Sequence, residues 1–144
     1  MTTPSLWWSL LWRFTLLFLV LSFALFPLAQ VLLVGIDEVK AIHMRPSVGW
    51  WLFAVLLWIA VAASPRFVSL VLWGERLHLT SAQWVLVCRG LALFFVALGI
   101  VNVLVAFSAS TVTWVNFKLF WPYPLFAAFL MPLSIWVRKT NAAN

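Results

Sequence analysis

The stretch that decides the fold of this chain is residues 80–139, TSAQWVLVCRGLALFFVALGIVNVLVAFSASTVTWVNFKLFWPYPLFAAFLMPLSIWVRK. Two long apolar runs flank the polar segment 108–116. The first run, residues 82–107, has about 26 residues and extends about 39 Å as a helix, enough to cross a hydrocarbon core of about 30 Å. The pattern therefore predicts a hairpin of two transmembrane helices. Aromatic anchors are expected near its turn and bend, at Trp114, Trp121 and Tyr123.

The composition of the whole chain favours a membrane setting. Of its 144 residues, 66% are hydrophobic and 8% are charged, whereas a soluble domain is roughly half apolar and a quarter charged. The 11 Trp and 13 Phe are suited to acyl chains and to the two interfaces. The net charge of +6 comes from single cations between apolar runs and forms no basic stripe. We therefore expect membrane lipids and other membrane proteins as partners, and no nucleic acid.

These features predict an all-α membrane protein with a single polytopic domain over residues 1–144. About four spans are expected, over residues 10–35, 47–64, 82–107 and 117–137. The first apolar run has about 22 residues, against about 7–15 in a signal-peptide core, so it is expected to be a retained helix. Residues 66–76 are too short to span, and their apolar spacing fits an interfacial amphipathic helix. A kinked continuation of the second span is the equal alternative.

The distribution of cations predicts the orientation. With four spans, most cations share the side of the termini, so both termini are expected to be cytoplasmic, in an inner membrane. The cations of that side are Arg13, Arg66, Arg76, Arg138 and Lys139, with Arg13 snorkelling towards its interface. The opposite side holds Lys40, Arg45 and Lys118.

The third span carries a candidate packing stripe. At helical spacing, small residues and one amide fall near one face, where a second helix can approach closely and Asn102 can form an interhelical hydrogen bond. Arg89, two turns inside the span, has two readings: an interfacial anchor or a group that pairs with a ligand. The residues of this stripe are Arg89, Ala92, Gly99, Asn102 and Ala106.

The connector 36–47, IDEVKAIHMRPS, concentrates ionisable side chains. It reads either as a solvated loop with weak ion pairs or as a site for lipid headgroups or a partner. Pro46 suits the first position of the second span. One His and two adjacent acids lack the spacing of metal ligands, so no metal site is expected.

Other chemistry is weakly represented. His43 and His78 have no partner ligands, and no cofactor is expected. Cys88 is expected to be a small buried hydrophobe. The sequence shows no nucleophile with a base and no phosphate-binding glycine loop, so catalysis is not expected.

Two segments resemble the intracellular septation protein A family, also called the inner membrane-spanning protein YciB family. RGLALFFVALGIVNVLVAF followed by TWVNFKLF is similar to its G-x-x-N-x-x-x-A-F-like run and W-V-N-F-K motif. LWGERLHLTSAQW is similar to L-G-K-x-L-x-L-P-x-x-W, and the connector to D-E-x-F-I-x-x-K-P-T. The matching interface positions are Asp37, Glu38, Arg45, Pro46, Trp114, Asn116, Phe117 and Lys118.

The resemblance implies an inner-membrane protein linked to septation and envelope maintenance, with no established enzymatic activity. Family members usually carry an additional N-terminal hydrophobic region, so this chain is expected to be a shortened member. The leading hypothesis is a non-catalytic scaffold or adaptor. The alternatives are an accessory subunit of a larger membrane complex, such as an energy-transducing assembly, and a small oligomeric transporter that uses Arg89, Gln30 and Asn102.

Overall fold

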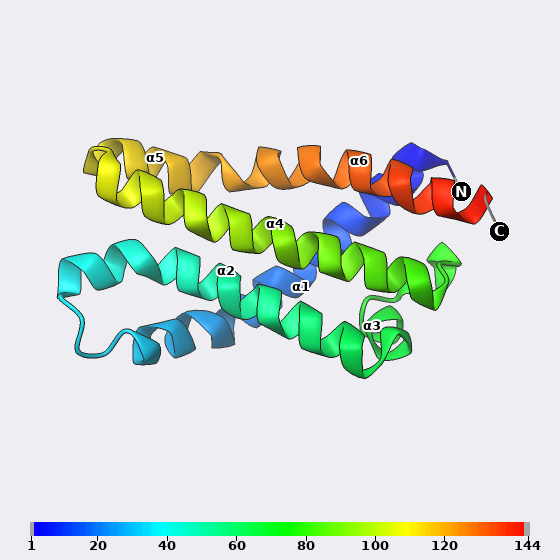
Figure 1. Ribbon diagram of the computed structural model, residues 1–144, viewed down its shortest axis with the longest axis horizontal. Coiled ribbons are helices and arrows are strands. Elements are labelled where there is room, and N and C mark those ends of the chain that lie inside the picture. Colours follow the sequence, from blue (N-terminus) through cyan, green and yellow to red (C-terminus); the bar gives the residue numbers. More distant parts are fainter. Residues whose placement is uncertain (1, 143–144) are drawn as a thin grey trace.

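Helices account for almost all of residues 2–142, the part of the chain that this computed structural model describes (Figure 1). The elements are α1 (Thr3–Leu32), α2 (Glu38–Ala63), α3 (Pro65–Val71), the 3-10 helix η1 (Gly74–Leu77), α4 (Ser81–Ser108), α5 (Thr111–Phe120) and α6 (Pro122–Ala142). No strand occurs within the described residues. The predicted all-α fold is confirmed.

Three helices, α1, α2 and α4, are each long and apolar enough to cross a membrane. The pair α5 and α6 passes the same test only when taken together, and it is bent by 45° at its break. Pro122 and Pro124 explain the bend, because neither can donate a backbone hydrogen bond to the preceding turn. Residues 2–142 therefore hold three helices able to span, or four with the bent pair. Both ends of the described chain lie at the same end of the bundle (Figure 1).

The second helix begins earlier than the sequence suggested. The connector 36–47 was expected to precede the span, but α2 starts at Glu38 and Pro46 lies inside it. Asp37 caps the helix, since its carboxylate accepts a hydrogen bond from the Lys40 backbone N–H at 3.3 Å. The assignment of Pro46 to the first helical position was therefore wrong, because neighbouring helices can support a proline within a span.

The segment after α2 forms a separate short helix. Ser64 has an extended backbone, and its hydroxyl accepts a hydrogen bond from the Phe67 N–H at 3.1 Å. Pro65 then occupies the first turn of α3. The α2 helix therefore ends at Ala63, and the next α-helix covers Pro65–Val71 rather than 66–76, because Trp73 and His78 turn the chain with positive φ of 48° and 50°.

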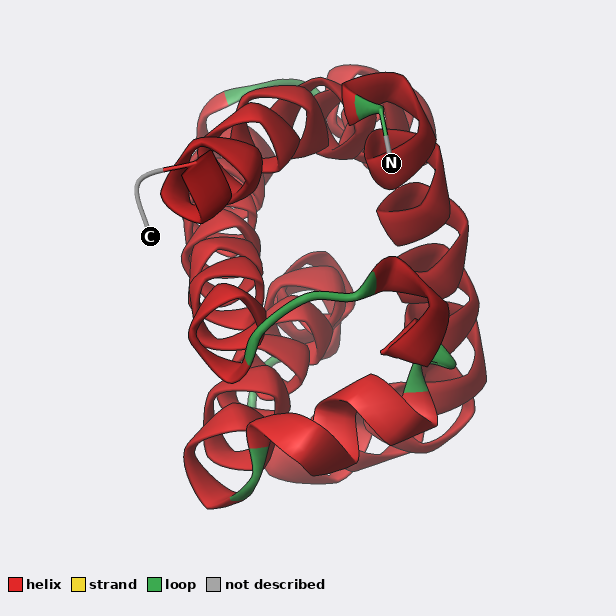
Figure 2. Ribbon diagram, turned by 90° about the vertical axis from the view of Figure 1, so that its right-hand side faces the viewer, coloured by secondary structure: helices red, strands yellow, loops and turns green. Residues whose placement is uncertain are grey.

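The core lies mainly between α2 and α4, with α1 and α6 packed around them. Figure 2 looks along the bundle and shows helices on all sides of its axis, joined by short loops. Three rings form the centre of this core: Phe53 contacts Phe18 and Phe95 edge-on, with ring centroids 5.1 and 4.9 Å apart. Thr80 caps α4 in a capping box with Gln83, as the sequence predicted.

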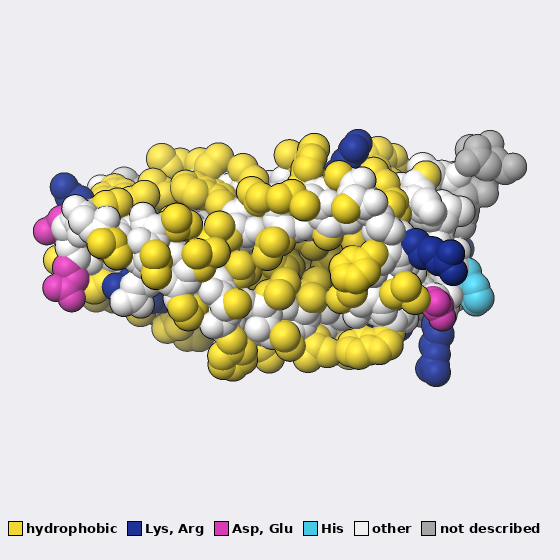
Figure 3. Space-filling view, turned by 90° about the horizontal axis from the view of Figure 1, so that it is seen from below, with side chains coloured by type: hydrophobic (Ala, Val, Ile, Leu, Met, Phe, Trp, Pro, Cys, Tyr) yellow, Lys and Arg dark blue, Asp and Glu magenta, His cyan; other side chains and the backbone are white. Residues whose placement is uncertain are grey.

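The surface is apolar along the bundle and charged at its ends. Figure 3 shows hydrophobic side chains covering most of one long face, with acidic side chains and most of the visible cations towards the two ends. Large side chains such as Phe23, Val34 and Val112 are strongly exposed. Such a surface is costly in water and stable against acyl chains, which fits the spans described above.

Candidate functional site

A buried hydrogen-bond network, which we call the Asn102 hub, joins three helices. The Asn102 amide nitrogen donates to the Ser47 hydroxyl at 2.8 Å and to the His43 carbonyl at 3.2 Å. Its amide oxygen accepts from the Trp114 indole N–H at 3.1 Å. Ser47 in turn donates to the Gly99 carbonyl at 2.9 Å. Asn102, Ser47 and Trp114 thus satisfy one another in an apolar setting, where an unpaired polar group is costly.

Local structure brings the hub together. Helices α4 and α2 pack side by side (Figure 1), and the short turn at residues 109–110 folds α5 back against α4. Ser110 caps α5 by accepting a hydrogen bond from the Thr113 N–H at 3.3 Å. Trp114 therefore lies one turn inside α5, twelve residues after its partner Asn102.

Gly99 allows Trp51 to lie against α4 beside the hub. The Trp51 indole donates to the Val96 carbonyl at 3.2 Å. A Cβ atom at Gly99 would overlap the Trp51 indole nitrogen. Only glycine therefore fits this approach without movement of the ring.

Two side chains cover the outer part of Trp114. The His43 ring lies with its centroid 4.3 Å from that of Trp114. The Lys118 ammonium lies 4.5 Å from the centre of the Trp114 ring, in cation–π geometry. The tryptophan thus connects the hub to a cation on the next turn of α5.

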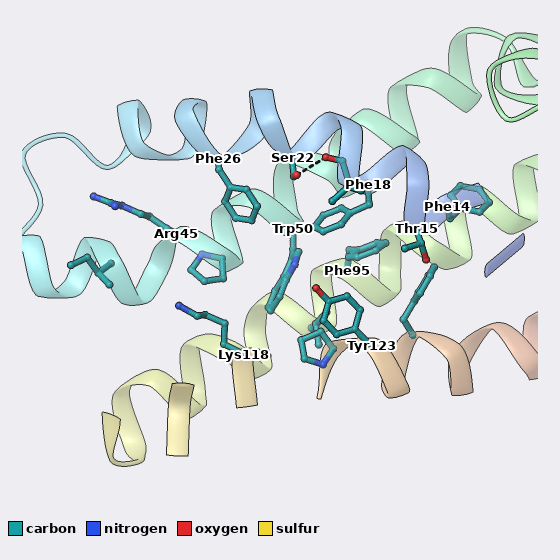
Figure 4. A pocket seen from close by; sticks show the side chains of 16 residues that line it. Phe14, Thr15, Phe18, Ser22, Phe26, Arg45, Trp50, Phe95, Lys118 and Tyr123 are labelled. Atoms are coloured by element: carbon teal, nitrogen blue, oxygen red, sulfur yellow. Dashed lines mark hydrogen bonds between the residues drawn. The ribbon is translucent and has the colours of Figure 1, made fainter. Parts of the chain in front are cut away.

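A cavity of about 530 Å³, which we call the aromatic pocket, lies beside these residues and is lined by α1, α2, α4, α5 and α6 (Figure 4). Rings make up much of its wall: Phe14, Phe18, Phe26, Trp50, Phe95, Tyr123 and Phe126. Figure 4 shows Arg45 and Lys118 at the same end of it, on different helices, with the Arg45 side chain extending away from the rings. The Arg45 Nε atom is buried and has no hydrogen-bond partner among the described residues.

The residues of the predicted packing stripe lie in different environments. Ala92, Gly99 and Asn102 are buried and Ala106 is half-buried. Arg89 is exposed, and its guanidinium lies 5.3 Å from the centre of the Trp58 ring on α2. The structure thus places Arg89 on the outside of the bundle, apart from the hub.

The residues predicted to lie at the membrane interface also differ in their exposure. Asp37, Glu38 and Asn116 are exposed, whereas Arg45, Phe117 and Lys118 are half-buried and Pro46 is buried. Trp114 was expected to anchor the chain at the headgroups, but it is only 3% exposed. That expectation was wrong, because the indole N–H finds its partner in Asn102 and not at a wet interface.

Sequence reasoning also missed the role of Arg13. It was expected to snorkel, yet it is 7% exposed. Its Nε donates to the Leu72 carbonyl at 2.8 Å and its Nη2 to the Trp73 carbonyl at 3.3 Å. The guanidinium therefore pairs the carbonyls left open where α3 ends. In the sequence, the expected end of a helix near Gly74 was the only sign that backbone carbonyls would be left open there. It did not indicate which side chain would bind them.

Metal ligands do not gather anywhere in residues 2–142: the structure shows no group there of three or more His, Cys, Asp or Glu suited to a metal. Cys88 is buried and free. The side chains that do converge are the amide, hydroxyl and indole of the hub and the two cations of the pocket.

Long apolar helices, charged ends and a buried polar hub define the class: this is a multi-pass α-helical membrane protein. The family model described as Intracellular septation protein A matches residues 29–144. The chain belongs to that family. The match includes the hub and both pocket cations, whereas most of α1 precedes it.

Curated relatives agree with this assignment. A protein named inner membrane-spanning protein YciB from Nitrosospira multiformis is 38% identical, over 72% of this chain and 57% of the relative. Proteins of the same name from Ralstonia pickettii and Paraburkholderia phytofirmans are 33% and 35% identical. The chain spans 57% and 56% of the length of these two relatives. No solved structure is significantly similar to it.

Proposed function

We propose that this chain is a non-catalytic scaffold or adaptor of the inner membrane, acting in septation and maintenance of the cell envelope. The observation that carries the proposal is the Asn102 hub. Asn102 and Trp114 are the polar members of the family-like motifs that lie deepest; Trp114 donates to Asn102, and Asn102 donates to Ser47 on α2. Residues used in this way hold helices in fixed positions, and the buried network specifies a single arrangement of them.

The helices that the Asn102 hub holds in place expose aromatic side chains on the surface of the bundle. Trp121, Tyr123 and Trp136 on the last two helical segments are each more than half exposed, as are Trp73 beside α3 and Trp8 on α1. Such rings can contact lipid or the helices of a neighbouring protein. We propose that they form the partner-contacting surface of the scaffold.

The same surface supports a second candidate, an accessory subunit of a larger membrane complex. In that case the exposed rings of α6 would be covered by a constant partner. A transporter is less well supported, because Asn102 is bonded within the hub and Arg89 stacks on Trp58. Asn102 is therefore unavailable to line a polar path, and Arg89 and Gln30, the other two candidates, are exposed.

The proposed orientation places both termini in the cytoplasm. The first residues of α1 and the last residues of α6 lie at the same end of the bundle (Figure 1). Arg66, Arg76 and Arg138 belong to segments at that end, which favours it as the cytoplasmic side. A cysteine introduced at Thr3 is expected to resist a membrane-impermeant thiol reagent in intact cells.

Native extraction separates the two candidates. The tagged chain is extracted from its own membrane in polymer nanodiscs, then sized and analysed by mass spectrometry. A scaffold should be recovered alone or with sub-stoichiometric envelope proteins. Co-migration with a stoichiometric large complex would overturn the scaffold and establish the accessory subunit. Trp136→Ala, with Trp58→Ala on another face as the matched control, then tests whether α6 forms the contact.

A further inference from the structure

We propose that the aromatic pocket binds one hydrocarbon chain of an anionic amphiphile, whose phosphate group is held by Arg45 and Lys118. This ligand goes beyond the scaffold role and does not depend on it. The pocket, the two cations and their depth in the bundle each support the assignment.

The shape and lining of the pocket fit a hydrocarbon chain. Its volume of about 530 Å³ falls within the ~300–1,000 Å³ typical of small-molecule sites. Most of its lining is aromatic or aliphatic, from Phe14 on α1 to Phe126 on α6. The few polar groups in the wall include the Ser22 hydroxyl, which already donates to the Leu19 carbonyl at 2.6 Å. A mainly polar ligand would lose its hydration there without replacement.

The charged side chains that line the pocket are all positive and lie at one end of it. Arg45 and Lys118 lie at the same end (Figure 4), and none of the lining residues is acidic. The buried Arg45 Nε has no partner among the described residues, although a buried guanidinium N–H normally bonds to an acceptor. An oxyanion at this end would supply the acceptor and offset both positive charges. A phosphate matches this need, because it offers several acceptor oxygens to a guanidinium and an ammonium.

Both cations lie near the end of the bundle where α2 and α5 begin (Figure 1). Arg45 is seven residues from the start of α2, and Lys118 is seven residues from the start of α5. Each therefore lies about 10 Å along its helix axis from the first helical residue, which we take as the level of the boundary between headgroups and acyl chains. A phosphate there leaves the attached chain pointing into the aromatic part of the pocket, so the chemistry favours a lipid over free phosphate.

The hub supports one of the two cations. Lys118 lies over the Trp114 ring, and Trp114 is held by Asn102. The ammonium is thus positioned before any ligand arrives, which lowers the entropy cost of binding.

The test is a binding assay with the full chain in an uncharged maltoside detergent. The probe is radiolabelled lysophosphatidic acid, which combines one acyl chain with a phosphate monoester. Arg45→Gln/Lys118→Gln should weaken binding by about tenfold or more, because two charge-assisted bonds are lost. The matched control is Arg66→Gln/Arg89→Gln, which removes two exposed cations outside the pocket. Its affinity should stay within about twofold of the unmodified protein. Equal affinities of the two double variants would overturn the proposal.

A second variant tests the chain-binding part and keeps both charges. Ser22→Phe places a ring in the pocket and should weaken the same probe by about tenfold. Ser22→Phe also keeps the pocket testable if the double charge variant does not fold. Unchanged binding by a folded Ser22→Phe protein, as judged by circular dichroism and gel filtration, would overturn the pocket as the site.

Competitors identify the source of the phosphate. Monoacylglycerol with the same chain, which lacks the anion, and millimolar inorganic phosphate, which lacks the chain, should both displace the probe poorly. Displacement by inorganic phosphate alone would overturn a lipid ligand in favour of a free anion. These results are independent of native sizing, so failure of the ligand proposal and failure of the scaffold proposal are distinguishable.

Discussion

The indole N–H of Trp114 donates a hydrogen bond to the side-chain oxygen of Asn102 at 3.1 Å, within the bundle. Two elements of the family-like signature, the amide of α4 and the tryptophan of α5, are therefore one physical unit. The ring of this tryptophan also carries the Lys118 ammonium on its face. Packing of the hairpin and presentation of a cation to the aromatic pocket are thus coupled through a single side chain.

The first prediction concerns this bond. Trp114→Phe keeps a ring but removes the donor, which leaves the buried Asn102 oxygen unsatisfied. We expect a loss of about 1–3 kcal/mol in the free energy of unfolding, measured by denaturation in mixed micelles. Trp121→Phe is the control, since Trp121 is 57% exposed. Equal losses in the two variants would show that the bond contributes no stability.

The second prediction concerns the approach of Trp51 to Gly99. Gly99→Leu forces the indole away from α4, because even a Cβ atom there overlaps it. We expect a loss of about 1–3 kcal/mol from overpacking and a change in elution during gentle purification. Ala97→Leu, at an exposed position of the same helix, should behave like the unmodified protein. Unchanged size and stability of Gly99→Leu would contradict this packing.

The third prediction concerns Arg13. Arg13→Gln removes the donors to the Leu72 and Trp73 carbonyls, and each buried acceptor left open costs about 1–3 kcal/mol. The loss should be local, so hydrogen exchange should rise at residues 68–78 more than in α4. Arg89→Gln removes an exposed cation and should leave this segment protected. Equal exchange in both variants would mean that Arg13 does not hold the break closed.

The fourth prediction concerns Gly74 and Trp84. A Cβ atom at Gly74 would overlap the six-membered part of the Trp84 ring, which is fully buried. Gly74→Ala should therefore destabilise the protein by about 1–3 kcal/mol. Trp84→Phe in the same chain should recover part of this loss, because the overlapping atoms are absent. Additive losses in the double-mutant cycle would argue against direct contact.

Much of the fold could be predicted from the sequence. The apolar run 82–107 closely matches α4, and Thr80 with Gln83 forms the expected capping box. The prolines at 122 and 124 indicated the irregular start of the last span. These features depend on residues that are close in the chain, since helix caps, proline breaks and the length of an apolar run are local properties.

The tertiary structure decided which side chains meet. Asn102 reaches Ser47 across 55 positions of sequence, and Arg13 reaches Leu72 across 59. In a soluble helix an apolar stripe would identify the buried face, but a helix in lipid is apolar all round. The spacing of residues along the third span therefore predicted that Asn102 could bond to another helix, but it did not identify the partner residue. It could not show that Trp114 turns inwards or that Arg45 and Lys118 share a pocket. Sequence alone determined that this protein spans a membrane as helices, whereas the packing of those helices against one another determined its hub and its pocket.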